Sequence, residues 1–530
     1  MEISTERNSE AGSSAKTFLG HFGIFFIMLC YPLLGMLWRH QYPIVSVEVF
    51  LFFISISLLA LLLSALTAAC RPWLSNVIFA ICITIVLVLQ FNLFFEGSLI
   101  LIAVMVILAI TAKQTFLQLT FAVFVALIIG AFIDSTLDQQ RNDSQVVQSE
   151  QQASLPPVVH IILDEFIGPD GLPPQDVPQA FRADILAFFE ENDFELYNRA
   201  YTHYHTTQDS LTHAFNFTND EETWALKAEI FHTKLSISEN RYFELLRQRG
   251  YTINIYQSEL VEFCQAVPEA VGRCMTHTAP NFETVRENVS SPWLRFRILA
   301  INLFEQSNLI RTFLEKRKWL LDWGVSFYQP KIIDEIGNDL EQARGGAYFA
   351  HLLLPHTPFV YNEDCELDYS SESWKRYVAQ GLVKNNVDTR ALRYLQYLPH
   401  AQCALKEVGR LFGRMRELDL YDDAIIIVHG DHGSAISLHS AHRLNQDKLT
   451  PEDYRDLFST LFAIKLPGGQ YREHDETISL NVLMSRTAME ITGKDQPESA
   501  FGVITEESPF IYLSGQFPLT RQEIDIFAQP

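Results

Sequence analysis

The chain has 530 residues, 48% of them hydrophobic, and its 63 acidic residues outnumber 40 basic ones, giving a net charge of -23. Only 5 basic and 6 acidic residues fall in residues 1–135, so residues 136–530 contain 35 basic and 57 acidic side chains. This acidity argues against nucleic acid as a partner, because neutralising phosphates needs clustered Lys and Arg. It does not exclude a phosphorylated substrate held through a metal ion.

Residues 1–135 are expected to form a transmembrane helix bundle. Apolar stretches mostly near the roughly 20 residues that cross a bilayer occur at about 18–38, 44–69, 73–95, 97–112 and 115–133. We expect five spans, with four as the alternative because the fourth stretch is short. No Asp, Lys or Arg lies deep inside a span, which favours an anchor over a transporter. A role in binding a lipid substrate is the alternative to a plain anchor.

The positive residues predict the orientation of this domain. Five spans would put Arg39 on one side of the membrane and, on the other side, Arg7, Lys16, Arg71 and Lys113. The side richer in Lys and Arg is the cytoplasmic side. We therefore expect a multi-pass protein of the cell (inner) membrane whose C-terminal part lies on the periplasmic or extracellular side.

Residues 136–155 form a predicted polar linker, rich in Gln and Ser and without an apolar period. Residues 156–530 are long enough for one large α/β domain with its own core. In chain order this domain alternates strand and helix signals, and the helical stretch 392–418 is expected to be kinked or divided at Pro399. Strands are expected at 158–163, 251–256, 347–354 and from 424, and helices at 181–192, 241–249 and 392–418. This alternation predicts a mainly parallel sheet between helices.

Four of the seven cysteines lie in the predicted outer domain: Cys264, Cys274, Cys365 and Cys403. An even number in an oxidising compartment suggests disulfides. Cys264 and Cys274 are the preferred pair because they are close in sequence, which leaves Cys365 with Cys403. Four buried thiols are the alternative.

The most informative stretch is 424–434, Ala-Ile-Ile-Ile-Val-His-Gly-Asp-His-Gly-Ser. Its apolar, β-branched start is typical of a strand buried on both faces. Ligands bind beyond the carboxyl ends of such strands, where Asp431 and His432 stand. Gly430 and Gly433 are expected to let the backbone turn tightly. We expect His429 to support the strand end, with metal binding as its alternative.

Asp164 and Glu165 follow the first strand of the domain in the same way. Two strand ends of this kind can share one ion. A site of carboxylate and imidazole suits Mn or Zn better than an all-oxygen site. We expect one divalent ion, with a second ion at Glu165 as the alternative.

The segment 201–218 is rich in hydroxyl and imidazole groups at a predicted helix start. Thr206, Thr207 or Ser210 would be favoured there as helix caps. The functional alternative puts one hydroxyl on the metal as a nucleophile, while the helix N-terminus attracts the anion under attack. Three histidines flank this hydroxyl group without being singled out by spacing: His203, His205 and His213.

The order of these segments resembles the alkaline phosphatase and sulfatase superfamily. An acid ends the first strand, a Thr stands at a helix start, a His-Thr-Pro-Phe segment covers 356–359, and Asp-His-Gly comes late. Roughly residues 156–500 are covered, and the chain looks most like membrane-anchored, sulfatase-like phosphotransferases such as lipoteichoic acid synthase and phosphoethanolamine transferases. The resemblance implies an alkaline-phosphatase-like αβα sandwich. Sulfate ester hydrolysis is not expected, because no outer cysteine has the Cys-x-Pro-x-Arg context of true sulfatases.

Carried over by position, the resemblance implies a metal site and two catalytic residues. Asp164 matches the first-strand ligand, and Asp431 with His432 match the late pair. Thr207 matches the nucleophile and a metal ligand, and His356 matches a histidine that contacts the phosphoryl group. Thr206 is one position away from the nucleophile and stays an alternative to Thr207.

Other polar residues are assigned less specific roles. His351 is expected to be structural. His439 and His442 could reach a substrate or line a solvated loop, and Arg443 could orient an anion or only solvate the surface.

The function implied is metal-dependent transfer of a phosphoryl-linked group, such as a phospholipid head group, through a covalent phospho-threonine. The acceptor would be a glycan or lipid of the cell envelope. A phosphate ester or diester hydrolase of the same fold is one alternative, and a non-catalytic envelope binding protein is another.

Overall fold

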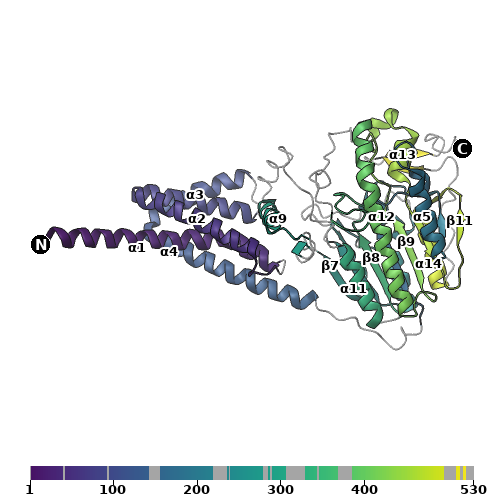
Figure 1. The fold of residues 1–530 in the computed structure, drawn as a ribbon, viewed down its shortest axis with the longest axis horizontal. Helices are drawn as coiled ribbons and strands as arrows, with labels where there is room; N and C mark the ends of the chain where they lie inside the picture. The colour runs from purple at the N-terminus through teal and green to yellow at the C-terminus, as the bar shows by residue number, and fades with distance from the viewer. Residues whose placement is uncertain are drawn as a thin grey trace. The chain divides into compact units, whose positions relative to one another are not determined.

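The computed structural model describes residues 2–39, 42–91, 95–142, 155–218, 235–237, 239–258, 260–277, 285–286, 289–305, 329–342, 345–367, 385–493, 509–513 and 517–520. The chain divides into two compact units (Figure 1). The helical unit comprises Met1–Asp143 with Pro280–Leu321, and the αβα domain comprises Ser144–Ala279 with Asp322–Pro530. Each unit is described by itself.

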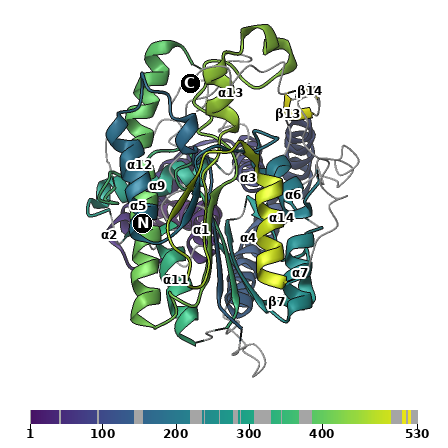
Figure 2. The same cartoon turned by 90° about the vertical axis from the view of Figure 1, so that its right-hand side faces the viewer.

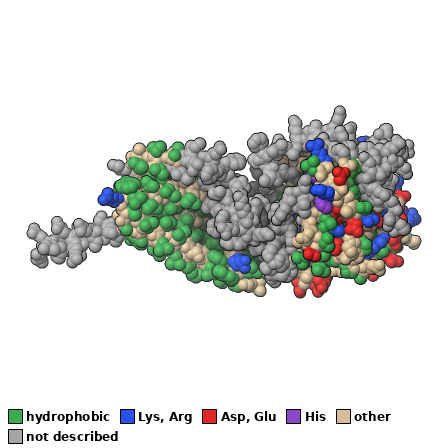
Figure 3. Space-filling view, turned by 90° about the horizontal axis from the view of Figure 1, so that it is seen from above, with side chains coloured by type: hydrophobic (Ala, Val, Ile, Leu, Met, Phe, Trp, Pro, Cys, Tyr) green, Lys and Arg blue, Asp and Glu red, His purple; other side chains and the backbone are tan. Residues whose placement is uncertain are grey.

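The helical unit starts with four helices, α1 (Glu2–Arg39), α2 (Val47–Ala69), α3 (Pro72–Phe91) and α4 (Phe95–Asn142). Three segments of described helix are long and apolar enough to cross a membrane: Lys16–Trp38, Val47–Ala69 and Thr115–Ile133. Pro72–Leu87 is a shorter apolar helix. Figure 3 shows hydrophobic side chains over much of the visible face of this unit, whereas acidic and basic side chains gather on the αβα domain.

Helix α4 differs from the expected pair of separate spans. It is one helix of 48 residues that contains both apolar stretches, 97–112 and 115–133. The sequence between them is Lys-Gln, which consists of good helix formers and offers no Gly or Pro at which the chain could turn. The helix also continues through residues 136–142 of the predicted linker, and linker residues 143–154 lie outside the described residues.

Helix α9 (Pro292–Glu305) groups with the N-terminal helices, although residues 156–530 were expected to form one domain. Its Phe296 ring lies 4.4 Å from the ring of Phe52 on α2. The Nε atom of Arg295 lies 3.2 Å from the carboxylate of Glu48, which is fully buried. A composition shift marks where a linker lies, but it does not reveal a later segment that returns to pack on an earlier unit.

The αβα domain is built on an eight-stranded sheet in the order β11-β2-β10-β9-β1-β8-β5-β7. The strands are β1 (Val158–Leu163), β2 (Glu195–Tyr197), β5 (Ile253–Ser258), β7 (Val271–His277), β8 (Ala347–Leu352), β9 (Ile425–Gly430), β10 (Phe462–Lys465) and β11 (Arg472–His474). Strand β1 pairs in parallel with β8 and β9, and β10 runs antiparallel to its neighbours. The predicted mainly parallel sheet is thus confirmed.

Two helical layers cover this sheet (Figure 2). One holds α5 (Gln179–Glu191), α11 (Gln329–Gln342) and α12 (Val387–Glu417). The other holds α6 (Thr207–Asn216), α7 (Arg241–Arg249) and α14 (Leu480–Thr492). Helix α12 continues through Pro399 as one element, so of the two expected outcomes, a kink or a division, the division does not occur.

The remaining elements are short. Helix α13 (Pro451–Phe458) follows β9, and three small sheets pair β3 (Ala200–Tyr201) with β12 (Ile478–Ser479), β4 (Leu235–Ser236) with β6 (Val261–Glu262), and β13 (Pro509–Leu513) with β14 (Phe517–Thr520). The main apolar core lies between the sheet and the α6, α7, α14 layer, and it includes Ile162, Leu211, Phe215, Phe349 and Ile427. This core holds α6, the helix that begins at Thr207, against the sheet.

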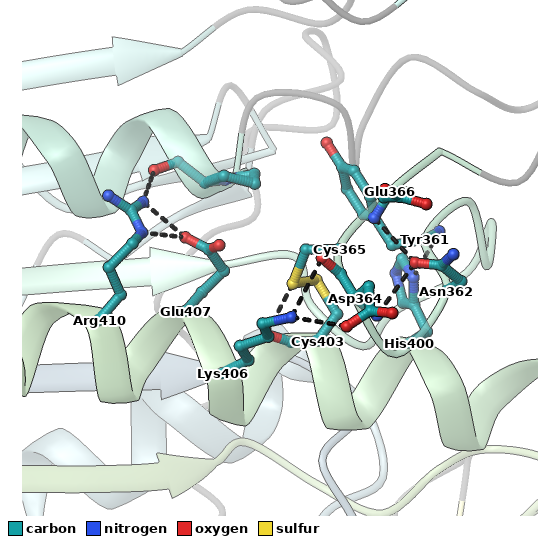
Figure 4. Close-up of a disulfide and its surroundings, with 11 residues drawn as sticks. Tyr361, Asn362, Asp364, Cys365, Glu366, His400, Cys403, Lys406, Glu407 and Arg410 are labelled. Atoms are coloured by element: carbon teal, nitrogen blue, oxygen red, sulfur yellow. Dashed lines mark hydrogen bonds and ion pairs between the residues drawn. A yellow bond between two sulfur atoms is a disulfide. The ribbon is translucent and has the colours of Figure 1, made fainter.

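Both expected disulfides are present. Cys264 bonds to Cys274, and Cys365 bonds to Cys403 on α12. Figure 4 shows the second bridge, beside which the Lys406 ammonium lies 2.9 Å from the Asp364 carboxylate. The bridge joins the segment that follows β8 to the middle of α12.

Candidate metal centre and nucleophile

The two acidic strand ends lie side by side because β1 and β9 pair in register. Leu163 pairs with Gly430, so Asp164 and Asp431 each come one residue after a paired position. The amide of Glu165 donates a hydrogen bond to Asp431 Oδ1 over 3.0 Å. Both aspartates are buried, with exposed fractions of 2% and 0%. Parallel pairing alone therefore brings carboxylates from two distant segments to one edge of the sheet.

Glu165 turns the chain sharply after the first acid. Its φ of 62° lies in the left-handed region, which costs a non-glycine residue roughly 1 kcal/mol. Its amide is fixed by Asp431 Oδ1, and its carbonyl accepts a hydrogen bond from the Tyr397 hydroxyl over 3.0 Å. The strained turn thus occurs directly beside the acid pair, where surrounding contacts hold it.

His351, for which the sequence predicts a structural role, lies beside the two aspartates. Ligand atoms of Asp164, His351 and Asp431 all lie within 4.8 Å of one another. His351 Nε2 is 3.3 Å from Asp164 Oδ2. Strand alternation is the signal that could have identified His351 as a site residue. His351 on β8 pairs with Ile162 of β1, which also pairs with His429 on β9. Because Asp164 comes two residues after Ile162, His351 lies on the same face of the sheet as Asp164.

The hydrogen bonds of Asp431 leave one oxygen available. Its Oδ1 accepts from the amides of Glu165 and His432, at 3.0 Å and 2.9 Å. Its Oδ2 is buried without a hydrogen-bond partner in the described part of the chain, as are Asp164 Oδ1 and both ring nitrogens of His351. Buried polar atoms of native proteins are normally satisfied. Carboxylate and imidazole atoms converging in this way fit a divalent cation.

The hydrogen bond of His432 to Gly433 determines which ring nitrogen carries the proton. Its Nδ1 lies 2.9 Å from the carbonyl of Gly433, which can only accept, so Nδ1 carries the proton. The lone pair therefore sits on Nε2, which lies 3.3 Å from Asp431 Oδ2 and 3.5 Å from Thr207 Oγ1. This tautomer is the one that a metal-ligating histidine needs.

Thr207 is the first residue of α6, and Thr206 is its N-cap. The Thr206 hydroxyl is engaged, since it donates to the Asp209 carboxylate over 2.7 Å. The Thr207 hydroxyl instead faces His432. Ser210 on the same helix donates to the Asp431 carbonyl over 2.5 Å, which ties α6 to the ligand segment. The two threonines that the sequence left open thus have different surroundings.

The buried carboxylates have shifted pKa values. Burial raises the pKa of Asp164, but the nearby imidazoles of His356 and His351 outweigh it and lower the pKa to about 2. Burial raises the pKa of Asp209, against the lowering effect of the hydrogen bond from Thr206. Asp164 is therefore ionised near neutral pH, as a metal ligand must be.

Gly430 and Gly433 are required by close packing. A Cβ on Gly433 would lie 1.9 Å from the Asp456 carbonyl oxygen, and one on Gly430 would lie 2.4 Å from the Phe166 carbonyl oxygen. Neither glycine has a positive φ, so a left-handed backbone conformation is not what requires either of them. Both allow other backbone segments to approach the ligand loop.

His356 lies near the acid cluster and is partly exposed. Its Nε2 is 3.8 Å from Glu165 Oε1, and its Nδ1 lies 2.5 Å from the Thr357 carbonyl. Of its side chain, 30% is accessible, in contrast with the fully buried His351. His356 can therefore meet a substrate that enters from solvent.

The other candidate histidines make local contacts. His429 contacts His160 and the Gly430 carbonyl. His439 faces Asp453 at 3.5 Å, and the His442 ring accepts a hydrogen bond from the Leu444 amide.

The three histidines that flank Thr207 also make local contacts. The His213 ring lies within hydrogen-bond distance of the Asp209 carbonyl, and the His203 carbonyl accepts a hydrogen bond from the Tyr512 amide. The His205 ring lies edge-on to Phe458. Arg443 is exposed.

Comparison with known proteins finds sequence relatives over part of the chain. No protein-family model matches. Lipoteichoic acid synthases of Staphylococcus aureus, among them that of strain USA300, are 29% identical over 126 residues. The match spans 23% of this chain and only 17% of the synthase's length.

Solved structures with a similar fold include two hydrolases. A 2-O GAG sulfatase has 11% sequence identity and a TM-score of 0.42, over 66% of this chain and 73% of that one. A phosphonate monoester hydrolase from Silicibacter pomeroyi has 16% identity and a TM-score of 0.38, over 66% and 75%. The sequence match to the lipoteichoic acid synthases supports the resemblance to the alkaline phosphatase and sulfatase superfamily that the motif order indicates.

Proposed function

We propose that this protein is a membrane-anchored, metal-dependent phosphotransferase that moves a phosphoryl-linked group, such as a phospholipid head group, to an acceptor of the cell envelope. Thr207 is the nucleophile and carries the group as a phospho-threonine. The observation that carries the proposal is the 3.5 Å approach of Thr207 Oγ1 to His432 Nε2, beside unpartnered oxygens of Asp164 and Asp431.

The residues that would hold the ion are Asp164, Thr207, Asp431 and His432, with His351 beside them. The orphaned buried atoms of this cluster fit one divalent cation, and the mixture of carboxylate and imidazole favours Mn or Zn. When bound, the ion supplies a Lewis acid that lowers the pKa of a hydroxyl group and stabilises phosphoryl charge.

In the first half-reaction the Thr207 hydroxyl releases its proton to solvent water, and its oxygen forms a bond to phosphorus. The bond from phosphorus to the leaving-group oxygen breaks, and His356 donates a proton to that oxygen. The amides at the start of α6 lie next to the reacting oxygen, and a helix N-terminus favours an anion there.

In the second half-reaction an acceptor hydroxyl passes its proton to His356 and attacks phosphorus. The bond to Thr207 breaks, and the Thr207 oxygen takes up a proton from solvent water. Water in place of the acceptor would give hydrolysis through the same intermediate, which is the second candidate function.

The two disulfides support placement of the αβα domain on the periplasmic or extracellular side, because such bonds persist in oxidising compartments. The apolar helices support attachment to the cell membrane. A substrate with a lipid anchor would then lie in the same bilayer as the enzyme, and a glycan or lipid acceptor would lie beside it.

The test follows labelled phospholipid head groups in membranes that contain the full-length protein. We expect the label to move to an acceptor with wild-type protein and not with Thr207→Ala, which should still bind metal. Thr206→Ala is the matched control and should keep most of the activity. A fully active Thr207→Ala variant would falsify the assignment, and release of free head group would favour hydrolysis.

A further inference from the structure

Three buried side chains behind the metal centre form a hydrogen-bonded chain. His429 Nδ1 lies 2.6 Å from the Gly430 carbonyl, and His429 Nε2 lies 2.8 Å from His160 Nε2. His160 Nδ1 in turn lies 3.2 Å from the Tyr242 hydroxyl. His160 is 1% exposed, and Tyr242 and His429 are fully buried.

The direction of every hydrogen bond in this chain follows from the carbonyl at its end. A carbonyl only accepts, so His429 Nδ1 carries a proton and its Nε2 bears the lone pair. His160 must then donate from Nε2, which leaves a lone pair on its Nδ1 for the Tyr242 hydroxyl. In this arrangement each contact along the chain joins one donor and one acceptor.

Aromatic rings surround the His160 ring. Its ring meets Phe215, Tyr242 and Phe349 at centroid distances between 5.2 and 5.9 Å. An apolar side chain would fill this space without the cost of burying a polar ring. We therefore assign to His160 the role of donating a hydrogen bond to His429 Nε2, which would otherwise be buried without this partner.

The far end of the chain reaches the metal centre. The Gly430 carbonyl and the Asp431 nitrogen belong to the same planar peptide group. A hydrogen bond that fixes the carbonyl therefore also fixes the orientation of the backbone at Asp431. The Gly430 amide is held separately by the Leu461 carbonyl over 2.9 Å. Metal ligands depend on such supporting hydrogen bonds, whose loss typically lowers metal affinity 10–100-fold.

We propose that His160 is a positioning residue of the metal centre, which acts through His429 and the Gly430 carbonyl to orient Asp431. The inference rests on the proposed metal site. His160 touches neither metal nor substrate in this scheme. Its role is to select one ring orientation and one tautomer of His429.

The test measures the dissociation constant of Zn²⁺, and separately of Mn²⁺, with the purified full-length protein. His160→Phe keeps the ring volume and removes the donor, and we expect its Kd to rise about tenfold or more. His160→Gln restores an N–H near the Nε2 position and should return the Kd to within about threefold of wild type. Phe349→Leu is the matched control for core damage, and it should lower the melting temperature while leaving the Kd unchanged.

Three results would overturn the inference: an unchanged Kd in His160→Phe, equal losses in His160→Phe and Phe349→Leu, or no rescue by Gln. If His160→Phe does not fold, Tyr242→Phe removes a single oxygen from the start of the chain and should raise the Kd several-fold. An unchanged Kd in that variant would then overturn it. Wild-type protein that binds no metal would instead refute the proposed function.

Discussion

His429 and His432 make the same local hydrogen bond, each from Nδ1 to the carbonyl of the glycine that follows it. The bond leaves the lone pair on Nε2 in both rings. His432 turns that lone pair toward Thr207, and His429 turns it into the core toward His160. The same His-Gly sequence thus occurs twice with different roles: His432 faces the proposed nucleophile, and His429 faces the core behind the site.

Replacing His351 by Gln should weaken metal binding about tenfold, because an imidazole lone pair beside Asp164 and Asp431 is lost while the polar volume is retained. Metal titration of the purified protein measures this. His356→Gln is the paired variant, and it should leave the Kd nearly unchanged while lowering turnover. Equal effects of the two variants on metal affinity would contradict their separate roles.

Gly433→Ala should destabilise the αβα domain severely and lower metal content, because the new Cβ would lie 1.9 Å from the Asp456 carbonyl oxygen. Gly413→Ala on α12 is the matched control, since its Cβ meets nothing within 4 Å. That change should be neutral or stabilise the fold by about 0.5–1 kcal/mol. Thermal unfolding compares the two, and a Gly433→Ala protein as stable as wild type would show that the ligand loop can shift away from Asp456.

Stability should fall between pH 7 and pH 5 partly through His400. Its ring is buried and accepts from the Tyr361 amide, and burial lowers its pKa to about 3. The unfolded chain, with a His pKa near 6.5, binds more protons over this interval, so stability is lost as pH falls below about 6.5. One such group contributes roughly 2 kcal/mol at pH 5.

His400→Asn keeps an acceptor for the Tyr361 amide and does not titrate. Urea unfolding at pH 7 and pH 5 should therefore show a smaller loss of unfolding free energy in this variant than in wild type. An identical loss in both proteins would mean that His400 does not contribute to the pH dependence.

Thiol counting should distinguish the bridged cysteines from the others. Denatured protein should show three titratable thiols without reductant, from Cys30, Cys70 and Cys82, and all seven after reduction. Seven thiols before reduction would exclude both bridges in the purified protein.

Removing the bridge between Cys365 and Cys403, which spans 38 residues, should cost about 4 kcal/mol. Removing the bridge between Cys264 and Cys274, which spans 10 residues, should cost about 3 kcal/mol by the same relation between loop length and unfolded-state entropy. Paired Cys→Ser variants compared by urea unfolding test the order of the two effects. The reverse order would show that strain in the folded state or contacts in the unfolded chain dominate.

Local sequence was sufficient for the features that depend on neighbouring residues. An apolar run followed by Asp431 and His432, and another followed by Asp164, predicted strands that end at a common edge, because parallel strands present their carboxyl ends together. The αβα architecture and both cysteine pairings were predicted from alternation and proximity in the same way, and all are confirmed.

Tertiary structure decided what depends on residues far apart in the chain. His351 enters the acid cluster only because β8 lies next to β1, and His160 meets His429 only because β1 lies next to β9. Nothing near residue 292 in the sequence reveals that α9 packs on α2. Strand order and long-range docking are set by how whole faces bury their apolar area, so they appear only once the chain is folded.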